Sequence, residues 1–298
     1  MFSPRFSAKL CSYRTRGLSN VGGGLNFGMS TNTVSKDDVR VQKLSELRPD
    51  CRIHPRRIAT GAEYLEACVA ITQQSQRYWF RGHASALWEL IPSALRYDTE
   101  AKRTEALRAV DAFKRLTVTK LRAAPPVSEQ LQWIPIARHF GLPTRLLDWT
   151  QNAAIALYFA CSEEEYDDGL VYVLDPIELN VAVDRERPRV FDVNRDADLI
   201  EPYLSLTGRK TARGRPSIAI NPVWNSERLV LQKGAFTLHG AGEFAITNQQ
   251  APSLVALPVL KEDKKDLLLE LEIIGIDEMS IFPEPEHVCA HIRKRLDL

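Results

Sequence analysis

Residues 132–161 read QWIPIARHFGLPTRLLDWTQNAAIALYFAC and decide the predicted fold. The apolar spacing predicts a helix over residues 128–140 and another over residues 152–162, with a turn at Gly141 and Pro143 between them. Asp148, Thr150 or Asn152 could be the N-cap of the second helix. The segment also carries polar and aromatic side chains that a purely structural segment does not need: His139, Thr144, Arg145, Asp148, Trp149 and Thr150. A buried, unpaired polar group costs about 1–3 kcal/mol, so we expect these side chains to converge on a site.

The flanking sequence alternates between helical and extended patterns. Thr60 and Glu63 form a capping-box pattern at the start of one predicted helix, and the aromatic run at residues 77–81 predicts a strand that ends at Gly82. Further helices are predicted at residues 99–124, 263–273 and 286–298, and short strands at residues 169–174, 228–231 and 235–238. We therefore predict a single α+β domain over residues 60–298, with short mixed or antiparallel strands and surrounding helices.

Two segments fall outside this pattern. Residues 1–50 begin with a basic stretch, rich in Ser and Gly, that has no acidic residue before Asp37. We predict a disordered tail, with a transit peptide or a true start at Met29 as alternatives. Residues 180–222 are polar and rich in arginine, with little periodicity, and predict an insertion or long loop.

The composition limits the possible partners. The chain has 298 residues, and its 39 Lys and Arg nearly cancel 38 Asp and Glu. No global field therefore favours nucleic acid or an anionic membrane, and no apolar run reaches the ~18–20 residues that span a bilayer. Five scattered cysteines without a CxxC pair argue against a disulfide framework and a zinc knuckle. We expect a soluble, cytoplasmic protein without a metal site.

Three ordered blocks resemble the FRG-domain family, which is named for its Phe-Arg-Gly motif. They are FRGH at residues 80–83, ARHFGLPTRLLDWTQNAAIALYFA at residues 137–160 and LELEIIGIDEMSIFPE at residues 269–284. RLVLQKGAFTLHG at residues 228–240 is similar to the family's Gln-x-Gly-x-Phe block. The resemblance covers roughly residues 60–298. It implies a protein of bacteria or their phages, but the activity of the family is poorly defined.

The blocks supply candidates for ligand binding. The Arg81 guanidinium could hold a phosphate or carboxylate with two parallel hydrogen bonds, or form a structural bridge to Asp148. The adjacent glycine lets a ligand or another backbone approach closely. Arg228 and Gln232 would share one face of an extended segment. The residues assigned to ligand binding are Gly82, His83, Arg145, Asp148, Trp149 and Arg228.

The order of these parts also looks like the split-sheet ADP-ribosyltransferase arrangement. That resemblance implies that Arg81 holds the dinucleotide, Thr144 positions the nicotinamide ribose and Gln232 steadies the charged sugar. Histidine side chains commonly serve acid–base chemistry, so His139 is a catalytic candidate if it faces the cleft, and a structural residue otherwise. We expect a cleft that binds a phosphorylated small molecule or nucleotide, with NAD as a candidate substrate and no certain cofactor. The alternative is a non-catalytic interaction or sensor module, with a protein partner, in phage defence or a toxin-like system.

Overall fold

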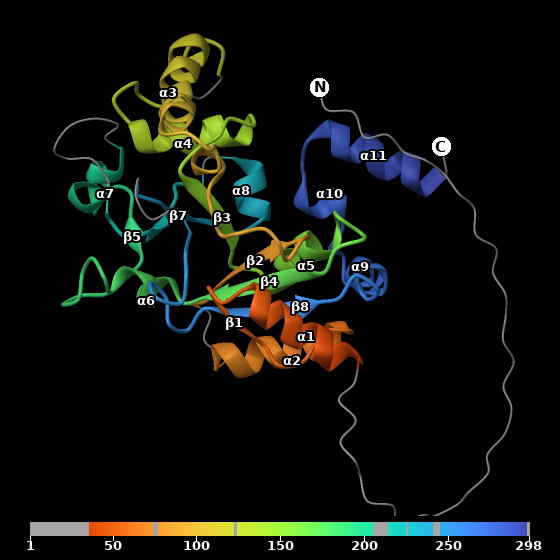
Figure 1. Ribbon diagram of the computed structural model, residues 1–298. Coiled ribbons are helices and arrows are strands. Elements are labelled where there is room, and N and C mark those ends of the chain that lie inside the picture. Colours follow the sequence, from red (N-terminus) through yellow and green to blue (C-terminus); the bar gives the residue numbers. More distant parts are fainter. Residues whose placement is uncertain are drawn as a thin grey trace, which may run out of the picture. The chain divides into compact units, whose positions relative to one another are not determined.

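The computed structural model describes residues 36–73, 77–121, 124–204, 214–224, 226–240 and 245–296. An eight-stranded mixed sheet, in the order β1-β8-β4-β2-β3-β7-β6-β5, forms its centre (Figure 1). The β1–β8 and β5–β6 pairs are parallel and the others antiparallel, which confirms the predicted α+β class. The strands are β1 (Arg52–Ile53), β2 (Trp79–His83), β3 (Leu146–Thr150), β4 (Gly169–Leu174), β5 (Phe191–Asp192), β6 (Ile218–Asn221), β7 (Gly234–Leu238) and β8 (Val255–Val259).

Helices lie on both faces of the sheet. They are α1 (Lys36–Leu47), α2 (Gly61–Thr72), α3 (Glu100–Thr117), α4 (Gln130–His139), α5 (Ala153–Cys161), α6 (Pro176–Asn180), α7 (Ala197–Leu204), α8 (Glu227–Leu231), α9 (Lys264–Ile273), α10 (Glu278–Ile281) and α11 (Pro285–Leu296), with a 3-10 turn, η1, at Ser93–Leu95. Among the described residues, no helix is long and apolar enough to cross a bilayer.

Alternating side chains of the central strands pack into different apolar cores on the two faces of the sheet. In β4, Val171 and Val173 pack with α2, α5 and α9, whereas Leu170 and Tyr172 pack on the opposite face with α1 and α6. This alternation follows from the two-residue period of a strand. A third core joins α3, α4 and α7 to strands β5–β7 through residues such as Trp133. The sheet is therefore covered on both faces, and strands β4, β7 and β8 are buried at every position.

Helix α5 packs directly on β2. A Cβ added at Gly82 would lie 2.0 Å from the carbonyl oxygen of Ala156 and 2.5 Å from the backbone nitrogen of Ala160. The glycine of the FRG motif is therefore required because the backbone of α5 lies against it. The sequence allowed a ligand or another backbone to approach Gly82 closely, and the structure shows another backbone.

Strands β2 and β3 separate soon after they meet. They pair only at Phe80↔Thr150, whereas β2 pairs with β4 along its whole length. Past that pair, the Arg81 guanidinium donates to the backbone carbonyl oxygen of Asp148 at 2.6 Å. A side chain thus occupies a position that strand pairing would otherwise fill, and the sheet opens there.

Several predicted elements need correction. Residues 146–150, for which no strand was predicted, form β3, and residues 228–231, predicted as a strand, lie in helix α8. The segment at residues 180–222 contains β5, α7 and β6 and so contributes to the sheet. Helix α1 occupies the later part of the predicted tail, while residues 1–35 lie outside the described part of the chain.

Candidate functional site

A cleft of about 650 Å³ opens where β2 and β3 separate. Phe80 and Phe159 lie on its α5 side, and α4 contributes Arg138 and His139 on the other. Residues predicted from separate blocks meet here. Those that line the cleft are Arg81, Gly82, His83, His139, Asp148, Trp149, Arg228 and Gln232.

The Arg81 side chain is fixed at two points. Its Nε donates to His83 Nε2 at 2.9 Å, and Nη1 donates to the Asp148 carbonyl oxygen. Arg81 and His83 lie on the same face of β2 as Trp79, because positions two apart on a strand share a face. Among the described residues, Nη2 of Arg81 has no hydrogen-bond partner. A held guanidinium with a free donor edge suits an anion.

His83 accepts a hydrogen bond from Arg81 and holds its side chain in place. It is buried, and its Nδ1 lies 3.1 Å from the Trp88 carbonyl oxygen, which can only accept a hydrogen bond. Nδ1 therefore carries the proton and Nε2 is free to accept from Arg81. Burial, and then the charge of Arg81, lower the pKa of His83 well below its usual value, so the ring stays neutral. Arg48 donates to the same Trp88 carbonyl oxygen at 2.6 Å and so helps to hold the acceptor of the His83 ring in place.

Asp148 is paired mainly with Arg138, not with Arg81. Arg138 donates from Nε to Oδ1 at 2.5 Å and from Nη2 to Oδ2, whereas Arg81 Nη1 lies 3.9 Å from Oδ2. Burial alone would raise the pKa of Asp148, but Arg138, followed by Arg81, holds it below its ordinary value. The bridge considered for Arg81 and Asp148 is therefore the weaker of two contacts.

The floor of the cleft carries an excess of positive charge. Burial, together with the neighbouring charges of Arg138 and Arg96, lowers the pKa of Arg81 to about 10, although Asp148 opposes this shift. The Asp148 carboxylate is thus the neighbouring negative charge for the guanidinium groups of Arg81, Arg96 and Arg138. A bound anion would add a second negative charge beside them.

The opposite wall gathers polar groups around Glu284. Its Oε1 lies 3.8 Å from His139 Nδ1 and 3.7 Å from Arg228 Nη1, and both of its carboxylate oxygens lack hydrogen-bond partners among the described residues. The Arg228 guanidinium stacks over the Phe282 ring at 4.5 Å. Gln232, the C-cap of α8, reaches the Ile281 carbonyl oxygen at 3.4 Å. Arg228 and Gln232 do share a face, but through one helical turn rather than an extended backbone.

Two predicted residues lie outside the cleft. Thr144 and Arg145 are buried and line a smaller pocket on the α3 and α7 side of the molecule. Thr144 Oγ1 accepts from the Leu146 backbone N–H at 3.3 Å, where the chain enters β3. The structure therefore does not bring Thr144 to the cleft for the implied ribose contact, nor Arg145 for the predicted ligand binding there.

Two more residues of this block have structural roles. Asp148 is not a helix cap, because Asn152 accepts from the Ala154 backbone N–H and caps α5. The Trp149 ring borders the cleft, but its Nε1 donates to Thr237 Oγ1 at 3.0 Å and only 3% of the residue is exposed. It anchors β3 to β7.

Arg138 and Glu284 were not predicted from the sequence as residues of the site. Arg138 stands beside His139 in the second family block, and one face of α4 carries it toward β3. Glu284 is the last residue of the LELEIIGIDEMSIFPE block. Both residues belong to the quoted family blocks, but only the fold shows which carboxylate pairs with which cation.

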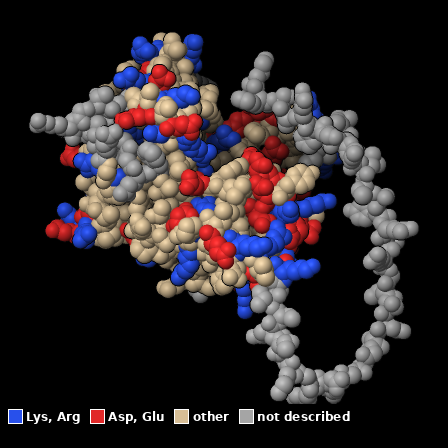
Figure 2. Space-filling view, in the orientation of Figure 1, with Lys and Arg blue, Asp and Glu red and all other residues tan. Residues whose placement is uncertain are grey.

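Charge over the rest of the visible surface is mixed. Figure 2 shows Lys and Arg interspersed with Asp and Glu, in agreement with the net charge of +1. The cluster of arginines in the cleft is therefore a local feature.

Among the described residues, no three His, Cys, Asp or Glu side chains are grouped to hold a metal ion.

Comparison with known proteins identifies one domain. The family model described as FRG domain matches residues 76–169, which include β2, α4, β3 and α5. Searches of curated proteins and of solved structures gave no match. The matched segment supplies the Arg81 strand and the α4 and β3 walls of the cleft, and residues 76–169 of the chain are an FRG domain.

Proposed function

We propose that the cleft binds a phosphorylated small molecule, most simply a nucleotide. The observation that carries this proposal is the Arg81 guanidinium, which is held by His83 and the Asp148 carbonyl and keeps Nη2 unpaired. The carboxylate nearest to it already accepts two hydrogen bonds from Arg138. A phosphate oxygen at Nη2 would supply the missing counter-charge through a charge-assisted hydrogen bond.

The remaining walls suit the rest of a nucleotide. Aromatic side chains line the cleft, among them Trp88, Tyr97, Phe159 and Phe282. A planar base stacks favourably on such rings, with about 1–3 kcal/mol per base. The cleft volume of about 650 Å³ falls within the range of about 300–1,000 Å³ typical of small-molecule sites.

The enzymatic form of the proposal is cleavage of NAD, by hydrolysis or by ADP-ribosyl transfer. Arg81 and Gln232 line the cleft, with Arg81 for the phosphates and Gln232 for the developing positive charge on the ribose. Glu284 lies behind them, with its buried carboxylate 3.7 Å from Arg228, and would position that guanidinium. The glycosidic bond breaks with its electron pair leaving on nicotinamide, and water or an acceptor nucleophile then bonds to C1′ of the ribose. Glycosyl cleavage of this kind passes through an oxocarbenium-like state that a carboxylate stabilises.

Calorimetric titration with ADP and with NAD tests the binding. Arg81→Ala should abolish the heat of binding, whereas Arg195→Ala should leave it unchanged, because Arg195 is an 84% exposed arginine outside the cleft. The absence of binding by the unmodified chain would reject the proposal.

Chromatography of the NAD reaction tests the chemistry. Nicotinamide release that Gln232→Ala or Glu284→Gln slows supports an enzyme. Binding that depends on Arg81, without any release, supports instead a sensor or interaction module of the kind considered for a defence or toxin-like system.

A further inference from the structure

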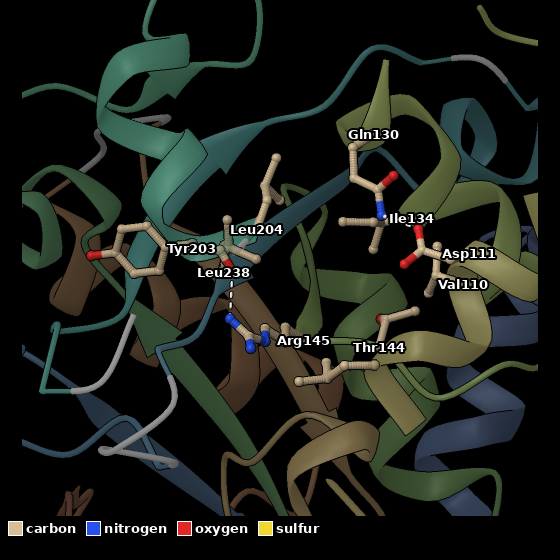
Figure 3. Close-up of a pocket in the computed structure, with 10 residues that line it drawn as sticks. Val110, Asp111, Gln130, Ile134, Thr144, Arg145, Tyr203, Leu204 and Leu238 are labelled. Atoms are coloured by element: carbon tan, nitrogen blue, oxygen red, sulfur yellow. Dashed lines mark hydrogen bonds between the residues drawn. The ribbon is translucent and has the colours of Figure 1, made fainter. Parts of the chain in front are cut away.

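A second pocket lies on the other side of β3 from Arg81. It has a volume of about 310 Å³ and none of its lining residues borders the cleft. Figure 3 shows Arg145 and Tyr203 at one wall, with Gln130, Ile134 and Asp111 across from them. Most of the remaining lining is aliphatic and comes from α3, α7 and β7: Leu107, Val110, Leu204 and Leu238.

Arg145 is poorly satisfied for a buried cation. Only 6% of the residue is exposed, and Nη1 donates to the Tyr203 carbonyl oxygen at 2.5 Å. Nε has no hydrogen-bond partner among the described residues, and no hydrogen bond joins Nη2 to any of them. The Nε–Nη2 edge of the guanidinium is the edge that pairs with a carboxylate through two parallel hydrogen bonds.

No carboxylate of the described residues forms an ion pair with Arg145. Asp111 lines the same pocket, but it accepts from Gln130 Nε2 at 3.1 Å and lies 3.7 Å from Lys114 Nζ. Burial lowers the pKa of Arg145 to about 10. A buried charge is normally paired, because leaving it unpaired is costly.

We propose that this pocket binds a small molecule that carries one carboxylate on an apolar body. The carboxylate pairs with the Nε–Nη2 edge of Arg145, and the body packs against the aliphatic side chains of α3, α7 and β7. Arg145 is the one cation among the described residues that line this pocket, and a single guanidinium suits a monoanion better than a phosphate dianion, which needs more donors. The site is independent of the nucleotide proposed for the cleft.

Benzoate and hexanoate are suitable probes, with benzyl alcohol and hexanol as uncharged counterparts. At about 10 mM, either acid should raise the melting temperature of the full chain by about 2–4 °C, even for a dissociation constant near 1 mM. The alcohols should give no comparable shift. Arg145→Met should remove the shift, whereas Arg81→Met, which alters the cleft, should leave it.

A direct measurement separates this site from the cleft and from effects on folding. Protein should broaden the ¹⁹F signal of 4-fluorobenzoate, hexanoate should reverse the broadening and ADP should not. Leu107→Trp, which fills the pocket and leaves Arg145 intact, should also prevent the broadening. Equal broadening with Arg145→Met, displacement by ADP, or no broadening by the unmodified chain would each overturn the proposal.

Discussion

The charge at the floor of the cleft depends on which acceptor each arginine reaches. Arg138 takes both oxygens of Asp148, so Arg81 is left with a neutral ring and a backbone carbonyl. Arg81 is therefore suited to ligand binding, while Arg138 positions Asp148.

Substitution of Gly82 tests the contact between β2 and α5. Gly82→Ala should lower the free energy of unfolding by about 3 kcal/mol, because the new methyl group would overlap the backbone of α5. Gly61→Ala is a matched control, since its Cβ would meet only the flexible end of the Glu270 side chain at 2.7 Å. That control should change stability by less than about 1 kcal/mol. Urea denaturation measures both, and equal effects would contradict the packing described.

The pH dependence of stability tests the neutral state of His83. Its pKa in the folded chain lies well below the unfolded value of about 6.5. Below pH 6.5 the unfolded chain therefore binds a proton that the folded chain does not, and stability is lost as the pH falls. The slope from this group approaches about 1.4 kcal/mol per pH unit. His83→Gln should remove that part of the slope between pH 6.5 and 5, and unchanged slopes in urea titrations would refute the assignment.

At the scale of elements, long periodic segments were predicted and short buried ones were not. Helix α2, with its Thr60–Glu63 capping box, and strand β4 appear where the sequence placed them. Strand β3 is five residues long with an aspartate at its centre, so it shows neither a clean alternation nor an apolar run. Helix α8 is also five residues long, too short for a 3.6-residue period to be distinguished from a strand.

The start of α5 gives a prediction at this scale. Asn152→Ala should destabilise the chain by about 1 kcal/mol, because the Ala154 N–H loses its side-chain acceptor. Asn152→Asp, which keeps an acceptor oxygen, should be nearly neutral. Chemical denaturation of both variants measures the cap directly. Asp148→Asn can lower the free energy of unfolding more than Asn152→Ala does, because Asp148 is the ion-pair partner of Arg138. An Asn152→Ala variant as stable as the unmodified chain would contradict the assignment of Asn152 as the cap.

At the scale of the whole molecule, the sequence predicted the fold class but not the strand order. Strands β2 and β3 are neighbours, yet β4 and β7 flank them from opposite sides, and this order depends on long-range pairing that local patterns do not encode. The gathering of Arg81, His139 and Gln232 was predicted from the family blocks. The separation of Thr144 and Arg145 from them could not be, because it depends on where β3 begins and on how α3, α4 and α7 pack beside it.

The near-neutral charge of the chain gives the last prediction. With a net charge of +1, long-range attraction of an anion is weak, and the affinity for a phosphate should come from the arginines of the cleft. Salt screens such charges over about 10 Å at 0.1 M, and a recessed cleft is screened less than an open surface. Raising NaCl from about 50 to 500 mM should therefore weaken ADP binding by only about threefold to tenfold, or about 0.6–1.4 kcal/mol. Adenosine, which lacks the phosphates, should show no such dependence, and Arg81→Ala should reduce the dependence for ADP in calorimetric titrations. A steeper loss that Arg81→Ala leaves unchanged would place the phosphate on surface lysines and arginines instead.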